Sequence, residues 1–134
     1  EFECPFWLRG YDSVKVLEKR YPGKIRFVYK AFPIDRHPHA LLAALIAHSA
    51  QAQGKFWEFH DRVMSKDGVG SRGLAPDALQ DYASAAGLDM PRVAKEVEAL
   101  QWAADVRRDM RQAKRLAVDS TPSFFVNGRP IAGA

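Results

Sequence analysis

Cysteine is nearly absent from this sequence: Cys4 is the only one among 134 residues. A single thiol cannot close an internal disulfide, so no disulfide framework supports the fold, and cysteine usage leaves the redox compartment undetermined. No apolar run approaches the roughly 20 residues that a helix needs to cross a bilayer. The first residues also lack the basic and then apolar pattern of a signal peptide. We therefore expect no membrane span.

The composition is that of one globular domain, with 47% hydrophobic and 27% charged residues. The net charge of +4 comes from 20 basic and 16 acidic residues, which alternate along most of the chain. One basic stretch contains Arg107, Arg108, Arg111, Lys114 and Arg115. We interpret it as a solvated helix face, because a nucleic-acid footprint would also cluster aromatic residues, and we expect no nucleic-acid partner.

The first third of the chain predicts a helix followed by a strand. Apolar residues at helical spacing extend from Pro5 to Tyr21, where Pro22-Gly23 ends the pattern. They are Phe6, Val14, Leu17 and Tyr21, and Gly10 interrupts the pattern. From Lys24 to Phe32, Ile25, Phe27 and Tyr29 alternate with Arg26, Val28 and Lys30, which predicts a strand.

The middle of the chain predicts a block of helices. Their ranges are His37–Gly54, Lys55–Ser65, Pro76–Gly87, Met90–Leu100 and Trp102–Leu116. The helical spacing of Phe56, Trp57 and Phe59 indicates core positions, and we place Trp102 there too. A strand that starts near Thr121, an Asn127-Gly128 turn and a partner strand from Arg129 to Ala132 follow.

Four stretches of the sequence together resemble the DsbA-like branch of the thioredoxin superfamily. They are FECPFW at the start, VYKAFP followed by HPH, GKFWEFHD, and TPSFFVNG near the end. The resemblance implies an α/β, thioredoxin-like fold with a helical insertion between the second and third core strands. Residues 1–134 would form a single domain, with 1–36 and 117–134 as the thioredoxin core and 37–116 as the insertion.

The resemblance also implies two elements that this chain lacks, a first core strand directly before the thiol turn and a last helix after the hairpin. Without that strand, buried backbone groups would stay unpaired, at about 1 to 3 kcal/mol for each group. We therefore expect that the chain is a portion of a longer protein, truncated at both ends. The alternative is that a partner segment or an oligomer supplies the strand.

Cys4 is the candidate catalytic residue. The unpaired N–H groups at the start of a helix favour a thiolate, and Pro5 suits the first helical position. The resemblance implies that Cys4 is the nucleophile and that Pro5 and Phe6 tune its reactivity. It also implies that Thr121 and Pro122 form a cis-proline loop, where the backbone of a substrate pairs beside the thiol. The alternative interpretation is that Cys4 is a small buried hydrophobic residue.

Trp7 departs from the family motif, because it stands where a second cysteine would resolve the mixed disulfide. Cys4 would then act as a monothiol in thiol-disulfide exchange on protein or peptide substrates, with an external thiol such as glutathione as co-substrate. Alternatively, the chain is a redox-inactive peptide-binding or structural module, or a glutathione-dependent isomerase or transferase of the related branch. A further possibility is that Trp7 is an engineered replacement.

Other chemistry receives little support from the sequence. The four histidines are His37, His39, His48 and His60, and no second cysteine or paired spacing completes a zinc site. We expect no metal and no bound cofactor, and packing or helix-start roles for the histidines. By the resemblance alone, the domain works outside the cytoplasm, in the periplasm or an equivalent compartment.

Overall fold

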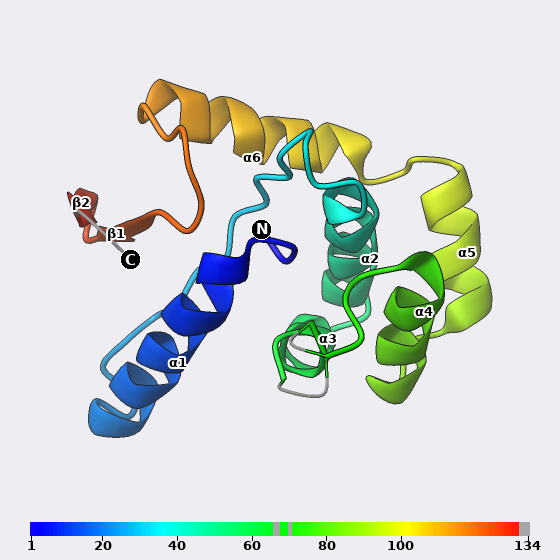
Figure 1. Cartoon of the computed structure of the whole chain (residues 1–134), viewed down its shortest axis with the longest axis horizontal. Helices are drawn as coiled ribbons and strands as arrows, with labels where there is room; N and C mark the ends of the chain where they lie inside the picture. Colours follow the sequence, from blue (N-terminus) through cyan, green and yellow to red (C-terminus); the bar gives the residue numbers. More distant parts are fainter. Residues whose placement is uncertain (66–67, 70, 132–134) are drawn as a thin grey trace.

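The computed structural model describes residues 1–65, 68–69 and 71–131, and these form six α-helices and one two-stranded sheet. The helices are α1 (Pro5–Arg20), α2 (Ala40–Ala52), α3 (Phe56–Val63), α4 (Pro76–Ala85), α5 (Met90–Glu98) and α6 (Ala103–Arg115). The strands are β1 (Phe124–Val126) and β2 (Arg129–Ile131). In Figure 1, α1 and the hairpin lie on one side and α2 to α5 on the other, while α6 runs along the edge that joins them.

Helix α1 begins at Pro5, whose fixed φ suits the first helical position, and ends before Pro22-Gly23. Its buried residues are Trp7, Gly10 and Val14, at helical spacing. The predicted interruption at Gly10 is wrong, because the helix continues through it. Glycine is needed there for packing: an added Cβ would lie 3.1 Å from the ring of Phe124.

The predicted apolar face of α1 is only partly correct. Val14 is buried, but Phe6, Leu17 and Tyr21 are 57%, 46% and 40% exposed. The buried line of the helix passes through Trp7 instead of its neighbour Phe6, because consecutive helical residues point in different directions.

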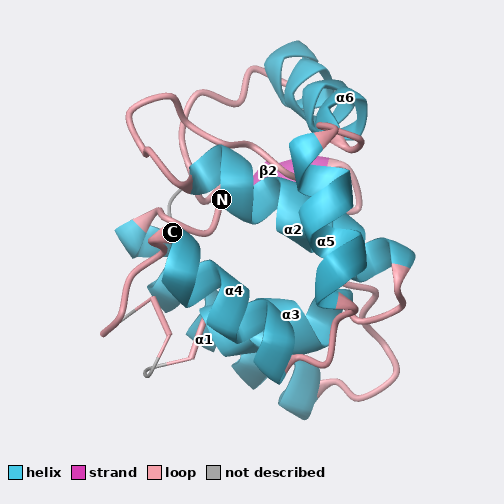
Figure 2. Cartoon of the chain, turned by 90° about the vertical axis from the view of Figure 1, so that its right-hand side faces the viewer, coloured by secondary structure: helices cyan, strands magenta, loops and turns pink. Residues whose placement is uncertain are grey.

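Helix α2 is the centre of the helical block and packs against α3, α4, α5 and α6 (Figure 2). Its sequence ALLAALIAHSAQA is apolar on nearly all sides, which is typical of a buried helix. Five of its alanines, at positions 40, 43, 44, 47 and 50, are at most 3% exposed. Their small side chains let the surrounding helices approach closely, so that α2 becomes the axis of the block.

The strand predicted over Lys24–Phe32 is wrong for the structure described, because no described residue pairs with this segment as a sheet neighbour. The segment runs between α1 and α2 (Figure 1). The predicted alternation persists in part of its side chains: Phe27 and Tyr29 pack against the core and Val28 is exposed, but Ile25 is exposed too. Alternation can be read locally, but a strand needs a second strand for its hydrogen bonds.

The C-terminal hairpin confirms the predicted Asn-Gly turn. Strands β1 and β2 pair antiparallel, with Phe124 opposite Ile131 and Val126 opposite Arg129. Asn127 and Gly128 both have positive φ, +49° and +79°, as a two-residue turn of this kind requires. Ala132, the last residue of the predicted partner strand, lies outside the described residues.

The large aromatic residues differ in burial. Phe59 is fully buried and Phe56 packs against the core, as expected. Trp57 is 41% exposed, so its predicted core position is wrong. Among the described residues, no helix has the length and apolar character needed to cross a membrane.

Candidate active site around Cys4

Cys4 is the residue that precedes α1, with an extended backbone at φ −71° and ψ 120°. This conformation turns the chain into the helix, and the backbone N–H of Trp7 donates to the Cys4 carbonyl at 3.0 Å. The thiol therefore lies at the helix start, as predicted. Only 4% of the residue is exposed, however, which differs from the accessible position that a nucleophile needs.

The structure brings Cys4 together with the Thr121-Pro122 loop. The thiol donates a hydrogen bond to the carbonyl oxygen of Thr121 at 3.0 Å, across 117 positions of sequence. The peptide bond between Thr121 and Pro122 is cis. The hydroxyl oxygen of Thr121 is buried and has no hydrogen-bond partner among the described residues. Three of the predicted site residues thus lie at one place.

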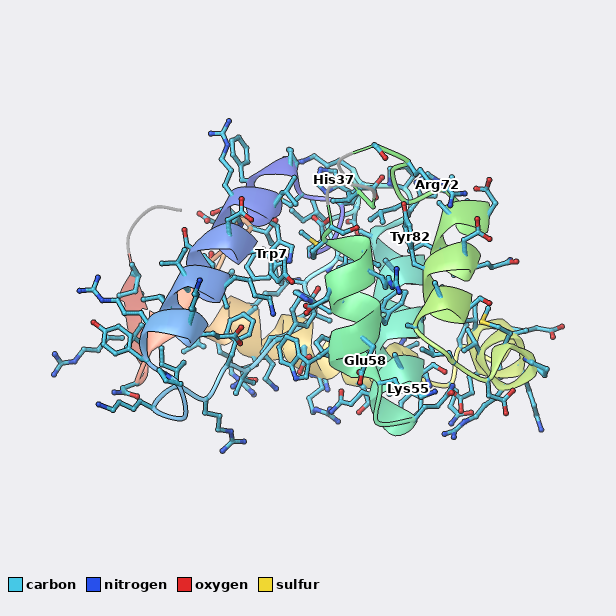
Figure 3. The ribbon with its side chains drawn as sticks, turned by 90° about the horizontal axis from the view of Figure 1, so that it is seen from below. Trp7, His37, Lys55, Glu58, Arg72 and Tyr82 are labelled. Carbon is cyan, nitrogen blue, oxygen red and sulfur yellow. The ribbon has the colours of Figure 1, made fainter. Side chains whose placement is uncertain are left out.

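The other motif residues separate into exposed and buried positions. Pro5 and Phe6 lie on the surface, beside the buried thiol. Trp7 is 4% exposed and lies on the side of α1 that faces α3 (Figure 3). Its position, one turn after Cys4, is that of a core residue.

Trp7 packs inside an aromatic cluster. Its ring centroid lies 5.7 Å from that of Phe124, 6.0 Å from His60, 6.3 Å from Tyr29 and 6.4 Å from Phe27. The indole N–H is buried without a hydrogen-bond partner among the described residues. Trp7 therefore connects α1 to three other parts of the fold: to α3, to β1, and to the segment that precedes α2. Its contribution at this position is packing.

Two acidic residues beside Cys4 hold the thiol turn against the start of α2. The Glu1 carboxylate lies 2.7 Å from Nδ1 of His37, and the Glu3 carboxylate accepts from the backbone N–H of His39 at 2.9 Å. His39 is the N-cap of α2, so Glu3 satisfies a free N–H group and places negative charge at the positive end of the helix.

The roles of Glu1 and Glu3 were not predicted from the sequence. The sequence predicts packing or helix-start roles for the histidines, and His39 has a helix-start role. The glutamates at the start of the chain and the histidines before α2 have side chains that can pair. No spacing rule, however, connects residues that are 36 positions apart. Glu1 also keeps one carboxylate oxygen buried without a described partner.

His60 is a buried residue next to Trp7. It is fully buried, and its Nδ1 lies 3.1 Å from a carboxylate oxygen of Asp61. Burial lowers the pKa of His60, more than the neighbouring Asp61 raises it. The rings of Trp7 and Tyr11 lie at 6.0 and 5.2 Å. His60 is thus a core residue beneath α1, in agreement with a packing role.

Asp61 connects this buried histidine to the surface of α1. Its other carboxylate oxygen accepts from Nζ of Lys15 at 3.1 Å. Partial burial raises the pKa of Asp61, but hydrogen bonds from His60, Tyr11 and Lys15 outweigh that effect and lower it. Burial and the hydrogen bond to Asp61 raise the pKa of Tyr11 to about 12. The network therefore fixes α1 against α3 with a charged carboxylate at its centre.

A pocket of about 330 Å³ lies away from the thiol, between residues 26–31 and the helices α2, α3 and α6. Its lining includes Tyr29, His48, Trp57 and Arg108, and it includes neither Cys4 nor Thr121 or Pro122. It is therefore separate from the candidate active site. Within the residues that the structure describes, no group of three or more potential metal ligands is gathered at one place.

Comparison with known proteins identifies the family. The model of a family described as thioredoxin matches residues 1–134. The chain therefore belongs to the thioredoxin family. It is also similar to a solved thioredoxin-like oxidoreductase from Silicibacter pomeroyi, with a TM-score of 0.86, 28% identity, and coverage of 99% of this chain and 73% of that one. The fold is that of the thioredoxin-like oxidoreductases, a class defined by thiol-disulfide chemistry.

Curated relatives are much longer proteins. The Na(+)/H(+) antiporter NhaA 1 of Salinispora arenicola is 35% identical over 135 residues, which cover 100% of this chain and 20% of the antiporter. The Na(+)/H(+) antiporter NhaA of Herminiimonas arsenicoxydans is 30% identical over 134 residues, with 100% and 21% coverage. The chain thus spans about a fifth of the length of these relatives.

Proposed function

We propose that the domain carries out thiol-disulfide exchange through Cys4 as a monothiol. The observation that carries this proposal is the position of the Cys4 sulfur, at the start of α1 and 3.0 Å from the carbonyl of Thr121. The helix start favours the thiolate that attacks a disulfide. The neighbouring backbone of Thr121 offers a peptide substrate a place to pair.

The exchange takes place in two steps, and each step breaks one disulfide bond and forms another. The Cys4 thiolate attacks one sulfur of a substrate disulfide, forms a mixed disulfide, and releases the other sulfur as a thiolate, which takes up a proton. An external thiolate such as that of glutathione then attacks the substrate sulfur of the mixed disulfide and releases Cys4. The external thiol is required because Trp7 offers no second sulfur within the motif.

Access to the sulfur requires a local rearrangement. A thiolate cannot donate a hydrogen bond, so ionisation breaks the contact with Thr121 and frees that carbonyl for a substrate N–H. Phe6, which is 57% exposed next to the thiol, gives the substrate an apolar surface. We propose protein or peptide disulfides as substrates, with the backbone at Thr121 and Pro122 as the docking position.

Incubation with glutathione disulfide tests the proposal, with intact mass as the readout. We expect one glutathione adduct on the folded chain, none on Cys4→Ser, and release of the adduct by added glutathione. If Cys4 forms the adduct only after the chain is unfolded by denaturant, it is a buried residue and monothiol exchange is rejected.

A second candidate function is a redox-inactive module that binds peptides or serves a structural role. The observation in its favour is the burial of Cys4, which is 4% exposed and whose thiol is already hydrogen-bonded. Peptide binding that persists unchanged in Cys4→Ser, together with no adduct on the folded chain, would favour this function over exchange.

We also propose that the domain works next to a membrane, as one part of a protein of the antiporter kind. The support is the match of the whole chain to a fifth of two Na(+)/H(+) antiporters. The family resemblance further favours a location outside the cytoplasm. Membrane fractionation of the native host, with an antibody against this domain, tests the first point. Recovery in the soluble fraction alone would contradict it.

A further inference from the structure

We propose that the outward face of α6 is a docking surface for anionic phospholipid headgroups. This face is defined by five exposed basic residues, which are Arg107, Arg108, Arg111, Lys114 and Arg115. With 3.6 residues in each turn, their positions fall within about a third of the helix circumference. The opposite side of α6 is the buried one, with Val106 and Asp109.

The positive charge of this face is largely uncompensated. Arg108 pairs with Asp105 on the edge of the face. Among the residues that the structure describes, the other four basic side chains form no ion pair. Asp109 does not neutralise them, because its carboxylate is buried and accepts from Nζ of Lys30 at 3.0 Å and from the N–H of Ala31 at 3.1 Å. Four cations therefore point to solvent from one side of one helix.

The same contacts hold the basic face in a fixed position. Val106 packs in a core cluster with Ala31, Ala44 and Leu45, and Asp109 attaches the helix to the segment before α2. Helix α6 lies along an outer edge of the molecule (Figure 1). At 1.5 Å for each residue, the basic residues from 107 to 115 form a strip about 12 Å long. A flat charged surface can contact the whole strip without any rearrangement of the fold.

The chemistry of the face favours lipid over single-stranded nucleic acid. Proteins that bind single strands interleave basic residues with aromatic ones on which bases stack, and α6 contains no aromatic residue. The inference rests on the proposed membrane location, and it is independent of the chemistry of Cys4.

Co-sedimentation with vesicles tests this surface. The 134-residue chain is mixed with vesicles of phosphatidylcholine, either pure or with about one third phosphatidylglycerol, at low and high salt. We expect binding to the anionic vesicles only, and its loss at high salt. The variant Arg107→Gln/Arg111→Gln/Lys114→Gln should bind roughly a hundredfold more weakly, at about fivefold for each charge.

The matched control removes three exposed cations that lie away from α6, at the end of α1 and just after it, as Lys19→Gln/Arg20→Gln/Lys24→Gln. It should retain most of the binding, and circular dichroism should show both variants folded. Equal binding by the two variants, no binding to anionic vesicles, or tighter binding to a DNA duplex would each overturn the lipid surface. Adduct formation at Cys4 should be unchanged in both variants, so a failure here is distinct from a failure of thiol exchange.

Discussion

The sulfur of Cys4 donates a hydrogen bond to the carbonyl oxygen of Thr121 at 3.0 Å, although 117 positions separate the two residues. This contact joins the start of α1 to the loop that leads into β1. It also holds the proton that must leave before the sulfur can act as a nucleophile. The same hydrogen bond therefore stabilises the resting fold and has to break during exchange.

Substitutions of Cys4 should separate its structural contribution from its chemistry. Serine keeps a donor for the Thr121 carbonyl, whereas alanine leaves that partly buried acceptor unpaired. We expect Cys4→Ala to be less stable than Cys4→Ser by about 1 to 2 kcal/mol. Urea unfolding measures the difference, and both variants should form no glutathione adduct. Equal stability of the two would mean that the hydrogen bond contributes nothing.

Trp7 should be costly to replace by the cysteine that the family motif has. The indole packs against four aromatic rings and is 4% exposed, so a much smaller side chain leaves a cavity. We expect Trp7→Cys to lose about 3 kcal/mol and Trp7→Phe about 1 kcal/mol of unfolding free energy. Urea unfolding monitored by circular dichroism measures both.

Trp7→Cys also tests whether the site can support a two-cysteine redox cycle, provided that the variant stays folded. If Trp7→Cys retains a cooperative transition and gains insulin-reduction activity, the site is still competent for a two-cysteine cycle. If it is as stable as the parent chain, the packing role assigned to Trp7 is wrong.

Gly10 should tolerate no large side chain. An added Cβ would lie 3.1 and 3.3 Å from the Phe124 ring and 3.3 Å from Trp7, so any larger group must displace these two rings. We expect Gly10→Leu to lose about 2 kcal/mol despite the better helix propensity of leucine. Thermal or urea unfolding measures it. Ser13→Leu, on the exposed side of α1, is the control and should change stability by less than about 0.5 kcal/mol.

Stability should fall as the pH drops below about 6.5, the ordinary pKa of histidine. Burial lowers the pKa of His60 in the folded chain, so in this range the unfolded chain binds a proton that the folded chain does not. Each such group lowers the unfolding free energy by about 1.4 kcal/mol for each pH unit, until the pH reaches its folded pKa.

His48 contributes in the same direction, because burial lowers its pKa too. Urea unfolding between neutral and mildly acidic pH should therefore show a smaller slope in His60→Gln and in His48→Gln than in the parent chain. If the unfolding free energy of the parent chain does not change with pH, or if its slope is the same in both variants, the two buried histidines are not the cause of the pH dependence. The Asp61 carboxylate, whose pKa is lowered, loses its contribution only at more acidic pH.

Local chemistry made most of the helices predictable. Pro5, Pro76 and Pro91 mark helix starts, Gly23 and Gly87 follow helix ends with positive φ, and helical spacing identifies the elements between them. The Asn127-Gly128 turn was predictable for the same reason, since two residues determine its backbone. Each of these features depends on neighbours within a few positions of the chain.

The sequence by itself determined the helices, the turn and the thiol at a helix start, because these depend on short-range backbone preferences. Only the tertiary structure decided which residues meet. Cys4 reaches Thr121, Glu3 caps α2, and Gly10 admits Phe124 through contacts between distant segments, for which no local rule exists. The segment 24–32 was predicted wrongly for the same reason. Its alternation is a local feature, but a strand also needs a neighbouring strand, and none of the described residues provides one.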